Sequence, residues 1–379
     1  MDDRQKALED ALDAFFTRDF PLDARRARER ALGEGDAPTP GKGLDRDLWR
    51  TLARTGVLSA RTLRHVDAAV ACEHMGRALF QSPYQDVVAA AELALAAGRS
   101  DLVDRIASGD AVVVLATRAR GDGDPAAPRG VDARPSGGGS RALTGRRRFV
   151  SFARDADLLV VPAGSSNDLC LVPTDRAGVR TRRHDETSRG ELYDVTFDDV
   201  EVGPGDVLLT GDDAARAFGR ALAHARVRQA CFVVGMARGS FEAVVAYTRQ
   251  REQFGQKISR FQALAFRMAA LAARIDGARL LAQQTAWRAD RGDDVGAAAA
   301  QALALAADVV RDVVTESIQM HGAVGVTERL EPSRYYRHAA VEAQRFGTVA
   351  TLRAHAAAHF ASPSDDESPP SRRLSGATP

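Results

Sequence analysis

Hydrophobic and polar positions follow three different patterns along the 379-residue chain. Up to about residue 108, apolar residues recur at three- and four-residue steps, as in KALEDALDAF near the start, which is the spacing of one face of a helix. From residue 109 to about 210, short β-branched runs such as AVVVLATR and ELYDVTFDDVEV are separated by turns. That pattern predicts a small all-β unit, with a long low-complexity loop over Gly121–Gly139.

The helical period returns after residue 211. Leucine, alanine and valine again fall three or four residues apart, and short connections separate the runs. Helices joined by short connections pack as antiparallel neighbours, so this part predicts a four-helix bundle. The predicted helices are Arg216–Arg249, Ser259–Gly292, Val295–Met320 and roughly Val341–Phe360.

The three patterns divide the chain into predicted domains of an α+β protein. We expect an N-terminal helical domain over residues 1–108, a central β domain over 109–210 and a C-terminal four-helix bundle over 211–361. The last stretch, 362–379, is polar and proline-rich, and it is predicted to be a disordered tail.

Composition narrows the class of protein. A net charge of +1 gives no electrostatic reason to expect binding to nucleic acid or to an anionic membrane. The three cysteines are far apart and form no CxxC or Cys/His motif, so the sequence predicts neither a disulfide framework nor a metal site. The N-terminus lacks the pattern of a signal peptide, and no charge-free stretch has the length of a membrane span. The sequence therefore predicts a cytoplasmic protein.

The connection between the first two bundle helices, RQREQFGQKISRFQ, carries an unusual set of side chains. The guanidinium of Arg251 can donate two N–H groups to an anionic group. Phe254 offers an apolar face, and the amides of Gln253 and Gln262 can donate and accept hydrogen bonds. A solvated helix corner with a chance arginine is the simpler alternative.

This corner resembles the Y-x-x-x-R-x-x-F-G motif of the acyl-CoA dehydrogenase family. QMHGAVG, which begins at Gln319, resembles a second family motif, and FDDVEV, which begins at Phe197, resembles a third. The resemblance extends over about residues 1–360. It implies the family's fold, with a β-barrel-like central domain, and an FAD held across a subunit interface by the corner together with Gln319, Gly322 and Ala323.

The resemblance also implies where the flavin ring lies. The family's flavin loop retains only Thr117 here, and its strand beside the flavin edge reads Phe149-Val150-Ser151, which keeps an aromatic ring and a hydroxyl group. Thr348 matches a further family position. Phe149 could equally be an aromatic residue of the core.

The family's catalytic base is absent from this sequence. The position of the usual glutamate holds Phe346, and the alternative position on the preceding bundle helix holds Ala225. A carboxylate base contributes roughly 10²–10⁴ in rate. Glu342 lies one helical turn before Phe346 and would share its face if the helix continued, but a glutamate paired with Arg345 or Arg337 is the more ordinary interpretation.

Three hypotheses remain open for an FAD protein of this kind. The first is a desaturase of an acyl-CoA or acyl-carrier-protein thioester that works as the glutamate-lacking subunit of a heteromer. The second is a homomeric flavin oxygenase or oxidase. The third is a non-catalytic subunit that completes a partner's FAD site. A dimer or tetramer with its own copies or with a related subunit is expected, and an electron-transfer flavoprotein is a possible further partner.

Overall fold

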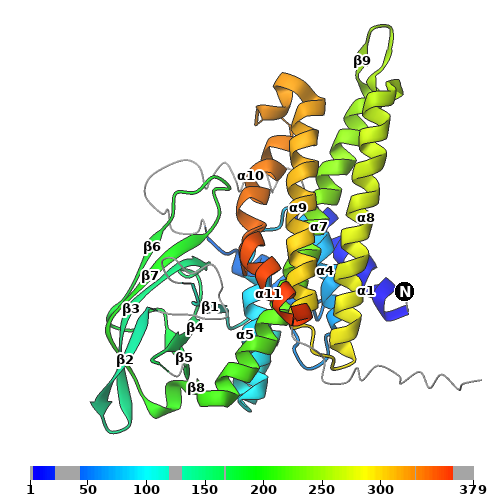
Figure 1. Cartoon of the computed structure of the whole chain (residues 1–379). Coiled ribbons are helices and arrows are strands. Elements are labelled where there is room, and N and C mark those ends of the chain that lie inside the picture. Colours follow the sequence, from blue (N-terminus) through cyan, green and yellow to red (C-terminus); the bar gives the residue numbers. More distant parts are fainter. Residues whose placement is uncertain (1–2, 22–42, 119–129, 166–167, 329, 362–379) are drawn as a thin grey trace, which may run out of the picture.

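The computed structural model describes residues 3–21, 43–118, 130–165, 168–328 and 330–361. The predicted tail, 362–379, lies outside these ranges. Figure 1 shows a long helical bundle, a β region beside its lower half, and further helices packed behind the bundle.

The N-terminal part is helical, as the sequence predicts. Its elements are α1 (Asp3–Ala14), the π-helical turn η1 (Phe15–Asp19), α3 (Arg46–Ala53), α4 (His65–Arg77), α5 (Tyr84–Ala96) and α6 (Ser100–Ala107). Helix α3 begins where the Asp45 side chain accepts hydrogen bonds from two backbone N–H groups, an N-cap. Helix α5 is buried over most of its length, which explains why it lacks a polar face.

The β region consists of two four-stranded sheets. One has the order β1-β4-β5-β8 and the other β2-β3-β7-β6. Strand β1 pairs with β4 in parallel, and the remaining pairs are antiparallel. The strands are β1 (Val113–Leu115), β2 (Val131–Gly137), β3 (Ser140–Ser151), β4 (Leu158–Ala163), β5 (Asp168–Pro173), β6 (Val179–Arg183), β7 (Leu192–Val202) and β8 (Val207–Leu209), with the short η2 (Pro204–Asp206) before the last.

The prediction of a loop over Gly121–Gly139 is wrong in part, because strand β2 lies within that range. Strand β2 lies at the edge of its sheet, is mostly exposed and includes Pro135. An edge strand of this kind has no continuous apolar face, so its sequence reads as a loop.

The C-terminal part contains five helices within the described residues rather than four. They are α7 (Gly211–Gln250), α8 (Gln262–Asp290), α9 (Gly296–His321), α10 (Pro332–Glu342) and α11 (Val349–Ala361), with η3 (Ile258–Arg260) before α8 and η4 (Gly322–Val326) after α9. The single helix predicted over Val341–Phe360 is wrong. The chain leaves the helical conformation between α10 and α11, where Phe346 has φ 63° and Gly347 has φ 142°.

The N-terminal helices join the bundle through a close contact between α4 and α7. A Cβ on Gly76 would lie 1.9 Å from the carbonyl oxygen of Phe232, and one on Gly235 would lie 2.1 Å from that of Glu73. Only glycine permits this approach. Helices α4 and α5 of the predicted N-terminal domain thus pack against α7 of the predicted bundle. The residue limits of the predicted domains stay predictions.

Helix α7 is the one described helix that is long and apolar enough to cross a membrane by length and composition. Most of its apolar window is buried against other elements, which is typical of the core helix of a folded domain.

Candidate functional site

A small cavity lies where α5, β1, β3 and the α10–α11 connection meet. It brings together four of the residues singled out from sequence: Thr117, Phe149, Ser151 and Phe346. The hydroxyl-bearing residues Thr117 and Ser151 are buried. The volume is about 30 Å³, room for about one water molecule.

Phe149 is turned out of the sheet at the rim of this cavity. The register between β3 and β7 shifts between Arg147 and Val150, and Phe149 adopts a positive φ of 55° within that irregularity. Irregularities of this kind re-aim a side chain next to a site. The ring is 40% exposed and stacks on His184 with ring centroids 4.7 Å apart. Phe149 is therefore a half-exposed platform rather than a core aromatic residue.

Asp194 organises the charges around that platform. Its carboxylate receives bonds from three cationic or imidazole groups: Arg148, Arg182 and His184. Burial alone would raise the pKa of Asp194, but these partners outweigh it and the pKa is lowered from 3.8. The carboxylate is thus charged at neutral pH and holds His184 against Phe149.

Phe346, which holds the predicted position of the family's base, lies beside a buried ion pair. Arg345 pairs with Asp86 of α5, and the Arg345 guanidinium lies 5.4 Å from the centre of the Phe346 ring. Arg226 on α7 donates from Nε to the carbonyl oxygen of Phe346 at 3.1 Å. Burial raises the pKa of Asp86, although the charge of Arg345 opposes that effect. These contacts hold the connection in its non-helical conformation.

Glu342 does not share a face with Phe346, because α10 ends at Glu342. Its Oε2 accepts a hydrogen bond from Gln229 at 3.0 Å and lies 3.6 Å from a guanidinium nitrogen of Arg345. The carboxylate is therefore occupied by an ion pair, as the more ordinary interpretation of the sequence holds.

Thr348 caps the following helix. Its hydroxyl oxygen accepts a hydrogen bond from the backbone N–H of Thr351 at 3.2 Å and lies 2.8 Å from the Thr351 hydroxyl group. The adjoining connection borders a second cavity of about 380 Å³ between α9, α10 and α11, lined in part by Arg311, Thr315 and Gln344.

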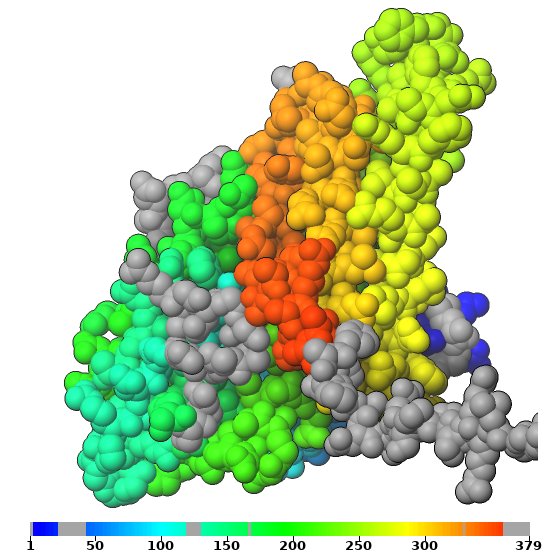
Figure 2. All heavy atoms as spheres, in the orientation of Figure 1, coloured from blue at the N-terminus to red at the C-terminus, as the bar shows by residue number. Residues whose placement is uncertain are grey.

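The polar corner is a two-stranded hairpin of β9 (Glu252–Gln253) and β10 (Gln256–Lys257). Phe254 and Gly255 both have positive φ, 53° and 77°, the conformation of a type I′ turn. Arg251, Gln253 and Gln262 are exposed, and Phe254 is 93% exposed. Figure 2 shows this end of α7 and α8 projecting beyond the rest of the molecule.

The second motif lies at the same end of the bundle. His321 stacks on Tyr247 of α7, with ring centroids 4.3 Å apart, one turn before the corner. Gln319, Gly322 and Ala323 are exposed beside it. The corner and this motif thus lie at one exposed end of the bundle, and Figure 1 places β9 of the corner far from β3, the strand that carries Phe149.

Comparison with known sequences identifies the C-terminal part. A family model described as acyl-CoA dehydrogenase, C-terminal domain, matches residues 215–360. A "Probable acyl-CoA dehydrogenase FadE25" of Mycobacterium tuberculosis is 36% identical over 155 residues, which cover 40% of this chain and 38% of that protein. The chain thus spans about two fifths of the length of the curated relatives it matches first.

Comparison with solved structures extends over nearly the whole chain. A steroid ACAD named Tcur3481–Tcur3483 superposes with a TM-score of 0.82 at 26% identity, over 94% of this chain and 97% of that one. A chain of the ChsE4-ChsE5 complex from Mycobacterium tuberculosis gives 0.83 at 24%, over 96% and 99%. A glutaryl-CoA dehydrogenase from Mycobacterium smegmatis in complex with FADH2 gives 0.85 at 19%, over 97% of each chain.

The C-terminal part of the chain belongs to the acyl-CoA dehydrogenase family. The predicted family is thus confirmed for residues 215–360, and the predicted fold is confirmed over nearly the whole chain. The roles assigned to individual residues stay predictions.

One cluster of side chains was missed from sequence. His65, Glu92 and His224 converge from α4, α5 and α7. Their wide separation along the chain leaves no motif, so nothing in the sequence alone marks them.

Proposed function

We propose that the protein is an FAD-dependent subunit of an acyl-CoA dehydrogenase that desaturates an acyl thioester of CoA or of a carrier protein. In this proposal it is the glutamate-lacking subunit of a heteromer. The observation that carries the proposal is the separation of the exposed corner from the cavity, because one chain cannot close its own site with both. A second chain has to supply the other half.

The residues present fit a flavin divided in this way. Thr117, Ser151 and the half-exposed face of Phe149 would hold the ring side. Arg251 and Gln319 would hold the pyrophosphate and adenosine side of a neighbour's FAD. Within the described part of the chain, the Arg251 guanidinium has no ion pair, so it is available to an anionic group.

An exposed apolar face supports the assembly. Phe266, Leu280 and Trp287 of α8 are 69%, 64% and 52% exposed. They are spaced by multiples of seven residues, which places them on one side of the helix. Exposed apolar side chains grouped in this way are typical of a surface that another subunit covers.

The chemistry follows from what this chain supplies and lacks. FAD, when bound, accepts the hydride that leaves the substrate's β carbon. The α-proton needs a base within hydrogen-bond reach. Phe346 cannot accept a proton, and the carboxylates of Asp86 and Glu342 are both held by Arg345. A partner that keeps the glutamate would therefore supply the base.

A second candidate function rests on the same ion pair. With Asp86 and Arg345 beside Phe346, about 30 Å³ remains, too little for an acyl chain. The chain could then be a non-catalytic subunit that only completes a partner's FAD site. Two further points stay predictions: that the substrate is a thioester of CoA or of a carrier protein, and that an electron-transfer flavoprotein accepts the electrons.

Replacing Phe346 tests these functions. Phe346→Glu places a carboxylate beside Arg345 and Arg226, and Phe346→Gln is the matched control without an acid. Each chain is assembled with a family member whose own catalytic glutamate has been replaced by glutamine, and the visible flavin absorption of the assembly is followed as acyl-CoA is added. The heteromer proposal predicts no bleaching with the natural chain or with Phe346→Gln, and bleaching with Phe346→Glu.

The assembly itself gives the second measurement. A colourless chain that gains flavin only when mixed with a glutamate-bearing family member supports the heteromer. A yellow homomer that consumes O₂ and is not bleached by acyl-CoA would overturn it in favour of an oxygenase or oxidase. Flavin uptake on mixing, with no bleaching in any Phe346 variant, would assign the non-catalytic role.

A further inference from the structure

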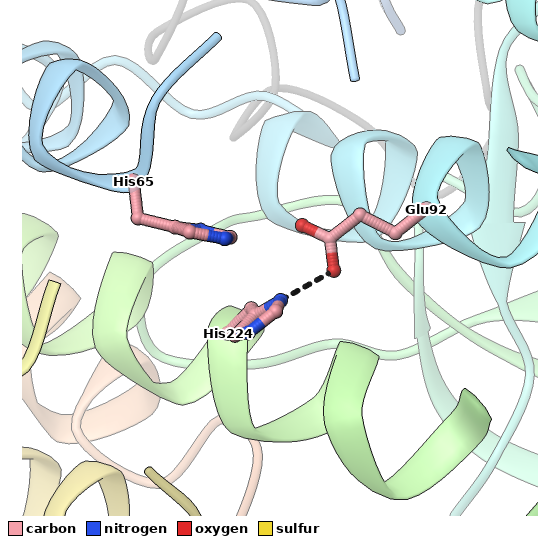
Figure 3. Close-up of side chains that lie close together, drawn as sticks. All are labelled: His65, Glu92 and His224. Carbon is pink, nitrogen blue, oxygen red and sulfur yellow. Dashed lines mark hydrogen bonds and ion pairs between the residues drawn. The ribbon is translucent and has the colours of Figure 1, made fainter. Parts of the chain in front are cut away.

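A third cavity lies among α4, α5 and α7, and none of the residues assigned to the flavin lines it. Its volume is about 270 Å³. Apolar side chains such as Leu63 and Val88 form part of its lining, and the polar part consists of His65, Glu92, Arg220, His224 and Arg228. Figure 3 shows the two imidazoles and the carboxylate pointing toward one another.

The three side chains have the composition of a metal site. One ligand atom from each of His65, Glu92 and His224 lies within 4.8 Å of the others. Two imidazole nitrogens and one carboxylate oxygen form a ligand set that zinc uses when a fourth position stays open. We propose that His65, Glu92 and His224 bind a divalent cation of the zinc class, with water from the cavity as the fourth ligand.

The groups around the ligands hold them as a metal site requires. Arg228 is 1% exposed and donates from Nη1 to Oε1 of Glu92 at 2.6 Å, which leaves Oε2 to face His224. A ligating carboxylate is ordinarily held by a hydrogen bond in this manner. The backbone N–H of His65 donates to Asp290 of α8 at 2.6 Å, so the start of α4 is fixed as well.

The contacts of the two imidazoles agree with this assignment. The ring of His65 lies against that of His224, with ring centroids 4.0 Å apart. Within the described residues, no hydrogen bond occupies the His65 ring nitrogens. His224 Nδ1 and Glu92 Oε2 are 3.0 Å apart, and a cation bound between them would replace that hydrogen bond, with the imidazole proton on Nε2.

The site is independent of the proposed flavin function, because none of its residues lines the cavity of Phe149. A bound cation would join α4, α5 and α7. Binding to the folded chain alone therefore raises the unfolding temperature.

The experiment uses the full chain without a histidine tag. The protein is treated with a chelator, desalted and titrated with Zn²⁺ against a chromophoric competitor, with Co²⁺ absorption as a reporter of geometry. We expect about one ion per chain and the intense visible bands of four-coordinate Co²⁺. His65→Asn and His224→Asn should weaken zinc binding by at least about tenfold. Losing a residue that only hydrogen-bonds a metal ligand already weakens metal affinity by roughly tenfold or more, and losing a ligand itself costs more.

His74→Asn is the matched control. His74 also lies beside a carboxylate, with Nδ1 3.2 Å from Asp13, but no second imidazole of the described residues joins them. Its replacement should leave zinc affinity unchanged. Glu92→Gln keeps the side-chain size and serves if a histidine variant fails to fold. No zinc retained at one equivalent, or equal binding by natural, His65 and His224 variants, would overturn the proposal.

Discussion

The ion pair between Asp86 and Arg345 gives the most quantitative test of the candidate site. In Asp86→Asn the carboxylate is lost while the side-chain shape is kept, and Arg345 stays largely buried, with 15% of its side chain exposed. Removing one partner of a buried pair costs about 3–5 kcal/mol of unfolding free energy. Glu342 remains 3.6 Å from Arg345 and compensates in part, so we expect about 3 kcal/mol.

A double-mutant cycle isolates the pair. Arg345→Met removes the other charge, and the combined variant leaves neither buried charge unpaired. We therefore expect it to be more stable than the sum of the single variants by about 2 kcal/mol. The free energies come from urea unfolding followed by circular dichroism.

A surface pair is the control for this cycle. Asp213 and Arg216 are both mostly exposed, with 76% and 70% of their side chains accessible. Asp213→Asn should cost no more than about 0.5 kcal/mol. If Asp86→Asn costs as little as Asp213→Asn, or if the two single effects simply add, the buried ion pair described above is wrong.

Two further predictions concern packing and pH. Because the pKa of Asp194 is lowered in the folded protein, its charged form stabilises the fold above about pH 4, and this contribution disappears as the pH falls below 3.8. Asp194→Asn should therefore flatten the acid dependence of stability in unfolding scans. Asp198→Asn, at an exposed carboxylate, should leave that dependence unchanged. Gly235→Ala should cost at least about 2 kcal/mol because its Cβ would meet the α4 backbone, whereas Gly219→Ala on the same helix has open space and should be neutral or stabilising in thermal unfolding.

The order of elements follows from the sequence because hydrophobic period is a local property. The long helices and most strands have periods of 3.6 or 2 over enough residues to be distinct. The break between α10 and α11 could not be predicted in this way. It depends on Phe346 accepting a bond from Arg226 and on Arg345 pairing with Asp86, contacts that join segments far apart in the chain.

The candidate site residues likewise differ in whether they form a local sequence motif. The corner is contiguous, so its arginine, aromatic and glycine residues were recognised together, and Thr117, Phe149 and Ser151 were found through the family pattern. The cluster of His65, Glu92 and His224 was not, since His224 and Glu92 are 132 residues apart. Only the packing of α4, α5 and α7 brings such residues together.

The claim that the corner clamps a neighbour's flavin is tested most directly by FAD occupancy in Arg251→Ala, measured in the purified assembly, homomeric or mixed. Loss of a charge-assisted contact to pyrophosphate removes about 1.5–3 kcal/mol, so FAD should bind roughly 10- to 100-fold more weakly. Arg249→Ala, an exposed arginine two residues earlier on α7, should retain the occupancy of the natural chain. Equal FAD occupancy in both variants would contradict the account.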